Sequence, residues 1–492
     1  MLSFRFSPEL QSHAMFEHAF YASWGRIPQL TKIEIRDNFL LVRPEIKGTG
    51  TVHIPMSHPQ YGMMLQSTET LQQRPKPYLL LKELGRGELG RVLRLLSEWK
   101  TLGFVPSDEL AGQIHEMIHS FGVMATSDET FPATEQAASE LFRLFGVLEA
   151  HLVDQYFEQT IAAYQKRHSY FSVPLGVFLG QDTTEELMEK LCMILDNDST
   201  GPLFNDAFQL VAATPSWKNV ELSPGKFHWD SVDRYFKFVE KLGKKPLIGP
   251  ILSFDPTSLP QWVRERINDR EAFEDAAVRY TIEFVNRYKQ RGSHWIVAGD
   301  FFSSPKCGFS IGRGVALICD LVREVRYAVR EGNILVMIGQ PYGDYYRTND
   351  CPLPFVAIIE SLASVRALDG FLLDLRLGLH PQDTLPRDPM LMGRLIDQWS
   401  IWGKKLFLSF SIPCQWNVFQ ETRTIDRPMP LQSEWAMRMI LACLTRQNVH
   451  GIFWNPLLDT TEEQSTGLIG TDGHVKPTFQ KIVTLRQALL EP

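Results

Sequence analysis

The sequence predicts an α/β protein whose larger part is a (β/α)8 TIM barrel, preceded by a small β-rich element and a helical segment. From about residue 170 onward, short apolar runs alternate with amphipathic helical stretches such as 230–242 and 272–291. In chain order the eight runs are FSVPLGVFLG, FNDAFQLVAA, KPLIGPILSF, HWIVAGD, NILVMIGQ, GFLLDLRL, KLFLSFSI and HGIFWNP. Eight strands separated by helices are typical of a TIM barrel, in which the loops after the strands form the active face.

The N-terminal third has a different pattern. Residues 29–55 alternate apolar and polar positions, and the turn signals RDN and KGTG divide them, which predicts antiparallel strands. Helical spacing begins near residue 78, and two further helices are expected at about 107–121 and 133–168. We therefore expect three parts: a β-rich element over 1–65, a helical segment over 66–168 and the barrel over 170–492.

Composition excludes several classes of protein. The chain of 492 residues carries a net charge of −7 and has no long basic run, so a general nucleic-acid binder is not expected. No apolar stretch reaches the roughly 18 residues that a membrane span needs, and the N-terminus lacks a signal-peptide pattern. The six cysteines lie far apart without a CxxC pair, which favours reduced thiols in a cytoplasmic protein.

One long segment of the barrel region resembles a known family. The stretch TPSWKNVELSPGKFHWDSVDRYFKFVEKLGKKPLIGPIL is similar to a passage of family 10 glycoside hydrolases, the xylanase-type barrels, with matches at Trp217, Glu221, Gly225, Phe227 and Asp233. In the family's order there follow SLPQWV, HWIVAGDFF, DGFLLDLRLG, GIFWNPLLD and GLIGTDGHVKPTFQKI. The resemblance runs from residue 170 to the end. It implies a barrel that binds a β-linked glycan and needs no cofactor or metal.

The positions that carry the family's chemistry differ here. The acid/base Glu aligns with Asp300 and the Asn before it with Gly299, while the nucleophile Glu falls near Ser409. The sixth-strand Gln and His become Asp374 and Arg376. Smaller or different residues replace the remaining polar positions, at Ala212, Ala213, Ser216, Phe254 and Asp255. Retaining hydrolysis needs two carboxyl groups about 5–5.5 Å apart, one of them the nucleophile, so the family's mechanism cannot operate unchanged.

A rebuilt pair of carboxylates is the alternative. Asp300, Asp344, Asp374 and Asp459 follow predicted strands four, five, six and eight, whose ends meet at one mouth of a barrel. Asp300 and Asp374, with Asp344 as a third candidate, are the catalytic residues to test. A separation of about 6.5–9.5 Å would indicate an inverting mechanism. The competing interpretation is that these carboxylates cap helices or pair with arginines such as Arg376.

Further side chains near the predicted mouth are candidates for binding the glycan. Tryptophans could stack on sugar rings, at Trp262, Trp416 and Trp454, whereas Trp295 lies inside a strand and is expected in the core. The full set of expected substrate-binding residues is Trp217, Glu221, Asp255, Arg376, Ser409, Trp416, Trp454 and Asp459.

Two short motifs suggest other chemistry. HEMIH, residues 115–119, fits the zinc-binding pattern H-E-x-x-H on a helix, with Glu116 as base, but no third ligand completes a longer pattern because Ala125 stands at that place. GRGELG, residues 85–90, fits a dinucleotide fingerprint, yet helices rather than a second parallel strand follow it, so we expect its glycines only to ease the start of a helix.

Three hypotheses of function remain open at this point. The first is a glycoside hydrolase-like protein that binds, and with a rebuilt carboxylate pair hydrolyses, a β-linked glycan. The second is a catalytically inactive barrel that binds sugar or serves as a scaffold. The third, a zinc peptidase, rests on HEMIH alone. The expected partner is a carbohydrate, without nucleic acid or membrane, and the sequence leaves the oligomeric state open.

Overall fold

The predicted TIM barrel is confirmed by the computed structural model. The structure describes residues 1–12, 14–23, 27–45, 48–58, 62–126, 131–181, 184–267, 269–301, 310–347, 353–378, 383–414, 431–459 and 465–490. The barrel strands are β9 (Leu175–Gln181), β10 (Leu210–Thr214), β13 (Lys245–Ile248) with β14 (Leu252–Ser253), β15 (His294–Gly299), β16 (Asn333–Gly339), β17 (Gly370–Arg376), β18 (Lys405–Ser411) and β19 (Val449–Trp454). All pairings among them are parallel, and β19 pairs with β9, which closes the barrel.

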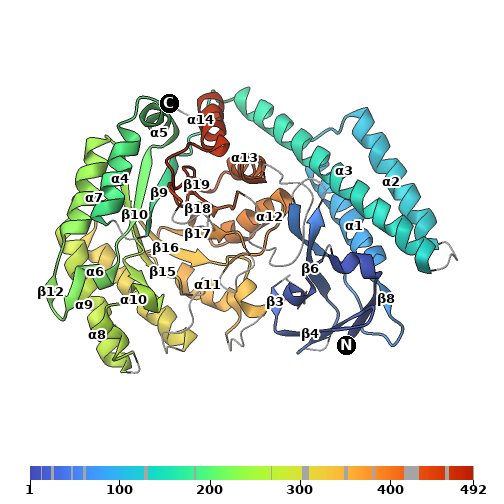
Figure 1. Cartoon of the computed structure of the whole chain (residues 1–492), viewed down its shortest axis with the longest axis horizontal. Helices are drawn as coiled ribbons and strands as arrows, with labels where there is room; N and C mark the ends of the chain where they lie inside the picture. The colour runs from blue at the N-terminus through green and yellow to red at the C-terminus, as the bar shows by residue number, and fades with distance from the viewer. Residues whose placement is uncertain are drawn as a thin grey trace.

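Helices surround the closed sheet, as Figure 1 shows. They are α4 (Glu185–Leu195), α5 (Thr200–Ala207), α6 (Trp217–Val220), α7 (Asp230–Lys241), α8 (Gln261–Arg264), α9 (Arg270–Tyr288), α10 (Ile311–Ala328), α11 (Phe355–Ala363), α12 (Pro389–Ser400), α13 (Leu431–Leu444) and α14 (Pro477–Leu489). A short hairpin, β11 (Glu221–Ser223) with β12 (Lys226–Phe227), follows the second barrel strand. Side chains from every barrel strand but β14 fill the interior: Phe178, Leu210, Ala212, Leu247, Ile296, Leu335, Met337, Leu372, Phe407 and Phe453.

The two faces of each strand explain why the sequence shows apolar runs rather than alternation. Inward side chains such as Ile296 pack in the interior, while their neighbours, among them the fully buried Trp295, pack in the larger core that includes the helices. A parallel strand covered on both faces is apolar throughout. Trp295 is therefore a core residue, as expected.

The N-terminal β-rich element consists of two four-stranded sheets. One has the order β4-β5-β1-β8 and the other β3-β2-β6-β7. Their strands are β1 (Leu2–Arg5), β2 (Phe20–Ala22), β3 (Pro28–Gln29), β4 (Thr31–Arg36), β5 (Phe39–Pro44), β6 (Thr51–His58), β7 (Gly62–Ser67) and β8 (Tyr78–Leu79). The antiparallel pairing of β4 with β5 and of β6 with β7 accounts for the alternation seen in the sequence.

Three long helices follow: α1 (Leu80–Thr101), α2 (Asp108–Thr126) and α3 (Phe131–Gln165). The expectation that GRGELG eases a helix start is wrong, because α1 begins at Leu80 and the motif lies within it. Its Gly87 has a packing role instead. A Cβ added at Gly87 would lie 1.9 Å from the carbonyl oxygen of Ser67, so only glycine lets α1 approach the end of β7 this closely.

A buried ionic cluster joins the N-terminal helices to the barrel. The guanidinium of Arg91 in α1 pairs with Glu88, with Glu149 of α3 at 2.7 Å, and with Asp388, which caps α12. Burial raises the pKa values of Glu88 and Glu149 to about 8 and lowers the pKa of the neighbouring His58 to about 4. Because three carboxylates surround one guanidinium, we infer that a proton stays on the Glu88–Glu149 pair at neutral pH.

The β-rich element also touches the loops that follow the fifth and sixth barrel strands. The backbone N–H of Leu65 in β7 donates to the carbonyl of Pro386 at 2.8 Å, and Leu385 packs with Phe20 and Ala22. In Figure 1 this element lies beside α12. It is therefore packed near the face of the barrel on which the strands end.

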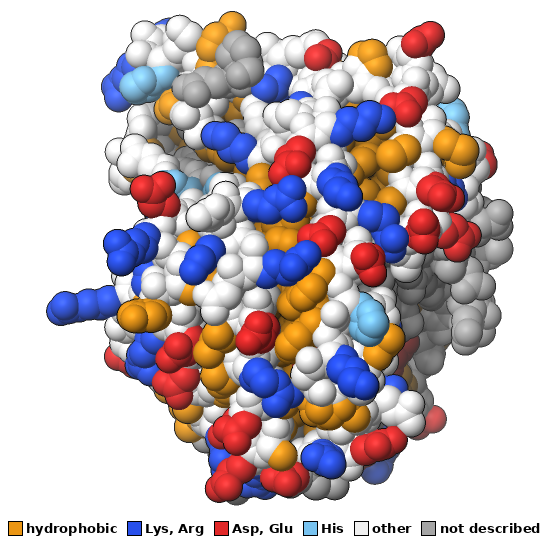
Figure 2. All heavy atoms as spheres, turned by 90° about the vertical axis from the view of Figure 1, so that its left-hand side faces the viewer, with side chains coloured by type: hydrophobic (Ala, Val, Ile, Leu, Met, Phe, Trp, Pro, Cys, Tyr) orange, Lys and Arg blue, Asp and Glu red, His pale blue; other side chains and the backbone are white. Residues whose placement is uncertain are grey.

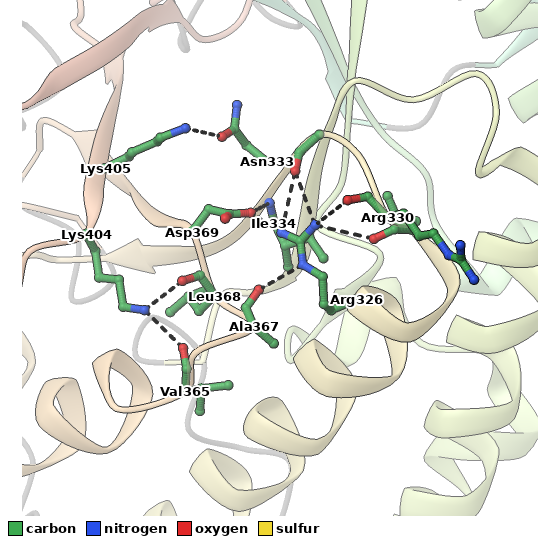
Figure 3. A network of polar contacts seen from close by, with 12 residues as sticks. Arg326, Arg330, Asn333, Ile334, Val365, Ala367, Leu368, Asp369, Lys404 and Lys405 are labelled. Atoms are coloured by element: carbon green, nitrogen blue, oxygen red, sulfur yellow. Dashed lines mark hydrogen bonds and ion pairs between the residues drawn. The ribbon is translucent and has the colours of Figure 1, made fainter.

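The opposite end of the barrel is closed by structural contacts. Arg326 of α10 pairs with Asp369, whose carboxylate also accepts the Ile334 N–H at 2.7 Å, and Figure 3 shows this network. There too, Lys404 donates to the carbonyls of Val365 and Leu368. These bonds join the starts of adjacent strands, which is the usual place for residues that stabilise a TIM barrel.

The outer face formed by α7 and α9 carries charges of both signs. Figure 2 shows acidic, basic and hydrophobic side chains interspersed on it. Arg287 pairs with Asp233 and Arg291 with Glu240, each at 2.8 Å, linking the two helices. Among the described residues, no helix combines the length and apolar character needed to cross a membrane.

The ionic cluster predicts how stability depends on pH. Glu88 and Glu149 bind protons more tightly when folded, with pKa values of about 8 against the ordinary 4.5. Their contribution to stability is fully present below pH 4.5 and is lost as the pH rises through 8. His58, with its pKa lowered from 6.5 to about 4, acts oppositely, and its contribution is complete above pH 6.5. Between pH 6.5 and 8 stability should therefore fall, by about 1.4 kcal/mol per pH unit for one proton.

Urea unfolding of the wild type, Glu149→Gln and the exposed control Glu140→Gln across this pH window measures the effect. The slope should flatten in Glu149→Gln and persist in Glu140→Gln. A wild-type profile that is flat between pH 6.5 and 8, or a slope that Glu149→Gln leaves unchanged, would contradict the assignment.

Candidate functional site

An arginine at the end of β17 lies between two carboxylates at the barrel mouth. Asp374 and Arg376 follow Leu372 on the inward face of the strand, since alternate residues share a face. Arg376 Nε donates to Asp374 Oδ2 at 2.6 Å, and its Nη2 donates to Asp300 Oδ1 at 3.1 Å. Ser253 Oγ donates to Asp300 Oδ2 at 2.8 Å. The site thus brings Asp300, Asp374 and Arg376 together in one bridged group.

The backbone around Asp300 is unusual. Asp300 directly follows β15 with φ of 58°, in the left-handed region that Asp tolerates better than most residues. Gln340, at the corresponding place after β16, has φ of 51°. The presence of glycine at position 299 has a steric reason. A Cβ there would lie 2.9 Å from Pro250 Cγ and 3.2 Å from Met337 Sδ, so the Asn of the resembled family would not fit.

The two carboxylates have different surroundings. The side chain of Asp374 is 2% exposed and that of Asp300 15%. Burial raises the pKa of Asp374; the nearby Asp300 raises it further, while Arg376 and Ser409 lower it. Ser409 lies opposite Asp374 in the β17–β18 register. Within the described part of the chain, neither Asp374 Oδ1 nor Ser409 Oγ has a hydrogen-bond partner of good geometry.

The other two strand-end aspartates are fully engaged. Asp344, at the start of the 3-10 helix η4 (Asp344–Arg347), is buried, and Arg387 binds both of its oxygens at 2.5 and 2.8 Å. The Leu385 N–H also donates to it. Asp459 accepts the Gly467 N–H at 2.7 Å and pairs with Lys476 at 2.5 Å. Neither carboxylate joins the Arg376 group by a contact that the structure records.

Trp217 and Glu221 form a buried support below the mouth. Glu221 accepts from Trp217 Nε1 at 2.7 Å, from the Gly225 N–H at 2.7 Å and from Arg279 at 3.1 Å. Trp217 stacks on Tyr280 with ring centroids 4.8 Å apart. These bonds hold the turn after β10, so the structure gives both residues a packing environment rather than a sugar-stacking surface.

The remaining aromatic and acidic candidates are dispersed. Trp454 is buried at the end of β19 and donates to the Thr466 carbonyl at 2.9 Å. Trp262 is half-buried and donates to the Glu221 carbonyl. Asp255 caps the 3-10 helix η3 (Pro256–Ser258) through the Thr257 N–H. Trp416 lies outside the described residues.

Two hollows adjoin the mouth. A small one of about 40 Å³ is lined by residues that include Thr214, Ser253, Asp255 and Asp300. This is space for about one water molecule. A larger one of about 360 Å³ is lined by Thr184, Glu185, Ser216, Asn219, His228, Asp230, Ser231 and Arg234. Ser216 lines both hollows, and its buried hydroxyl has no hydrogen-bond partner among the described residues.

Apart from Ser216, the residues of the larger hollow were missed by sequence reasoning. They lie after the first two barrel strands, in the connections and helix starts that include α4, α6 and α7. The available signal was their position, because polar residues just after TIM-barrel strands face the active end. The resembling stretch covers most of these residues, but its matched positions, such as Trp217 and Glu221, were the ones taken as candidates.

The HEMIH motif lies far from this arrangement along the chain, in α2. His115, Glu116 and His119 are all exposed on that helix. Among the described residues no group of three or more His, Cys, Asp or Glu side chains could hold a metal ion. The geometry gives the zinc hypothesis no support.

Comparison with known proteins yields structural similarities at low identity. No family model matches the sequence. Xylanase 10B from Thermotoga petrophila RKU-1, in complex with xylobiose, is similar over 64% of this chain and 95% of its own, with 12% identity and a TM-score of 0.48. Xylanase 10B from Thermotoga maritima is similar over 68% and 98%, with 12% identity and a TM-score of 0.48.

An exo-β-1,4-mannosidase from Opitutaceae bacterium strain TAV5 is also similar, over 65% of this chain and 61% of its own, with 14% identity and a TM-score of 0.45. Identities this low say nothing about activity. TM-scores below 0.5 add nothing to the barrel that the strand pairing already establishes.

Removing the bridging cation should destabilise the barrel. Arg376→Met keeps the length of the side chain but leaves the buried Asp374 without a counter-charge. Breaking a buried pair costs about 3–5 kcal/mol. Because the Arg376 side chain is 36% exposed, we expect a smaller loss, about 2–4 kcal/mol, measured by urea unfolding.

Two further variants test whether the lost counter-charge of Asp374 causes this destabilisation. Arg323→Met breaks an exposed pair with Asp320 and should cost less than about 1 kcal/mol. Arg376→Met combined with Asp374→Asn should recover part of the loss. If Arg376→Met unfolds at the wild-type midpoint, or if the double variant recovers nothing, the guanidinium does not compensate Asp374.

Proposed function

We propose that the barrel binds a β-linked glycan at its mouth without hydrolysing it. The observation that carries this proposal is the bridge from Arg376 to both Asp374 and Asp300. A glycosidase needs one carboxyl as a proton donor and a second as nucleophile or base. Burial raises the pKa of Asp374, but the guanidinium occupies one oxygen of each carboxyl and acts to lower this pKa, which opposes proton donation.

The charge of Arg376 also acts on the reaction itself. Glycoside hydrolysis passes through a transition state that resembles an oxocarbenium ion and carries positive charge on the sugar. A fixed guanidinium at the mouth repels that charge. Ser409, at the place of the resembled family's nucleophile, has no carboxylate to offset it.

Support for binding comes from the larger hollow. Its volume of about 360 Å³ falls within the range of about 300–1000 Å³ usual for ligand sites. It offers hydroxyl, amide, imidazole, carboxylate and guanidinium groups, from residues such as Ser216, Asn219, His228, Asp230 and Arg234. These donors and acceptors match the hydroxyl groups of a sugar.

Hydrolysis by a rebuilt pair is the second candidate, and one observation favours it. Burial raises the pKa of Asp374, as a general acid requires, and its Oδ1 has no hydrogen-bond partner of good geometry within the described part of the chain. A substrate that displaced Arg376 would leave Asp374 as acid and Asp300 as base. The following experiment separates the two candidates.

Xylobiose, cellobiose and β-1,4-mannobiose are titrated calorimetrically into the full chain, and the same mixtures are assayed for released monosaccharide. We expect saturable binding of at least one disaccharide without turnover in the ordinary enzymatic range of about 1–1000 per second. Asn219→Ala should weaken that binding about tenfold through a lost hydrogen bond, whereas the matched control Asn286→Ala, exposed on α9, should not. Steady product release that Asp374→Asn abolishes would establish the hydrolase instead. Absence of binding to every disaccharide would refute the proposal and leave a scaffold.

A further inference from the structure

A larger hollow lies on the N-terminal side of the molecule, between the β-rich element and the helices. Its volume is about 400 Å³. Its wall is formed by strands β6 and β7, by residues flanking β2, β6 and β7, and by helices α1 and α12. The lining residues are Ser23, Thr49, Gly50, Thr51, His53, Ser67, Thr68, Glu69, Thr70, Arg91, Arg94 and Gln398. None of these residues belongs to the barrel mouth, and neither hollow there shares a residue with it.

The lining is rich in hydroxyl groups, several of which have no hydrogen-bond partner among the described residues. The side chains of Thr49, Ser67, Thr70 and Gln398 form no hydrogen bond with any described residue. Arg91, which is 3% exposed, also lines the hollow, and its Nε has no hydrogen-bond partner within the described ranges. Donors and acceptors therefore converge on one space, and an unused buried donor contributes to its wall.

Both guanidiniums that line the hollow are already paired with carboxylates. Arg94 pairs with Glu69 at 2.6 Å, and Arg91 is matched by Glu88, Glu149 and Asp388. An anion would have to compete with carboxylates already bound to both guanidiniums. A neutral molecule can instead exchange hydrogen bonds with the hydroxyls and with the outer edges of the Arg94–Glu69 pair.

We propose that this hollow is a second ligand site, built for a neutral, polyhydroxylated molecule of one or two sugar rings. Its size falls within the range of about 300–1000 Å³ usual for small-molecule sites. Thr51 and His53 are held in place, since their side chains are hydrogen-bonded to each other at 2.8 Å and His53 stacks on Phe20 with centroids 4.7 Å apart. Pre-positioned groups of this kind reduce the ordering cost of binding.

The site is independent of the function proposed for the mouth, and the test keeps the two apart. The probes are glucose, xylobiose, cellobiose and β-1,4-mannobiose, with inorganic phosphate as the anionic comparison, each titrated into the full chain by calorimetry and saturation-transfer NMR. The test variant is Ser67→Val combined with Thr70→Val. It removes two hydroxyls that make no hydrogen bond in the described structure, at a strand position and an exposed position where valine is tolerated.

Ser57→Val, in the neighbouring strand β6 and outside the hollow, is the matched control, and Asn219→Ala reports on the mouth. We expect saturable binding of at least one neutral sugar that the double variant weakens at least about tenfold, while Ser57→Val and Asn219→Ala leave this binding unchanged. Saturable binding of phosphate in place of sugar would overturn the proposal. So would the absence of sugar binding, or sugar binding that Asn219→Ala abolishes and the double variant does not alter. In that last case the mouth binds sugar and the N-terminal hollow does not.

Discussion

The guanidinium of Arg376 touches both carboxylates that could act at the barrel mouth, and its position follows from the strand register. Asp374 and Arg376 share the inward face of β17, and the closed parallel sheet brings Asp300 from β15 within reach of the same side chain. Each carboxylate keeps its charge partner without help from a ligand. Both carboxylates are thus already bound to the one guanidinium, which supports the proposal of a binding surface over that of a proton-transfer site.

The same kind of pairing recurs at other buried carboxylates among the described residues. Asp344 meets Arg387, Asp459 meets Lys476 and Glu221 meets Arg279. At the junction with the N-terminal helices the balance is reversed, because Arg91 faces three carboxylates. That excess of negative charge makes the junction sensitive to pH, because one glutamate has to be neutral for the buried cluster to be stable.

Much of the fold could be predicted because burial on both faces turns each barrel strand into an apolar run. The third strand is the exception in detail, since it is divided into β13 and β14. The two N-terminal sheets could be predicted only in part, because β1, β2 and β8 are short and lie outside the stretch of alternating apolar and polar residues. At the site, the sequence could indicate which carboxylates follow strands, but not their counter-ions, since Arg387 and Arg279 come from distant positions. Nor could the packing role of Trp217 be predicted, because the stacking of its ring on Tyr280 depends on the fold.

A residue-resolved titration of Asp374 tests the central role of Arg376 most directly. Carbon-13 NMR of the aspartate carboxyl groups, assigned by Asp374→Asn, would follow this group in the wild type and in Arg376→Gln. Burial should place the wild-type pKa of Asp374 above its ordinary value, and loss of the neighbouring cation should raise it further. An Asp374 carboxyl that titrates identically in the two proteins would show that the guanidinium does not hold it, and the account of a bridged, non-hydrolytic mouth would be wrong.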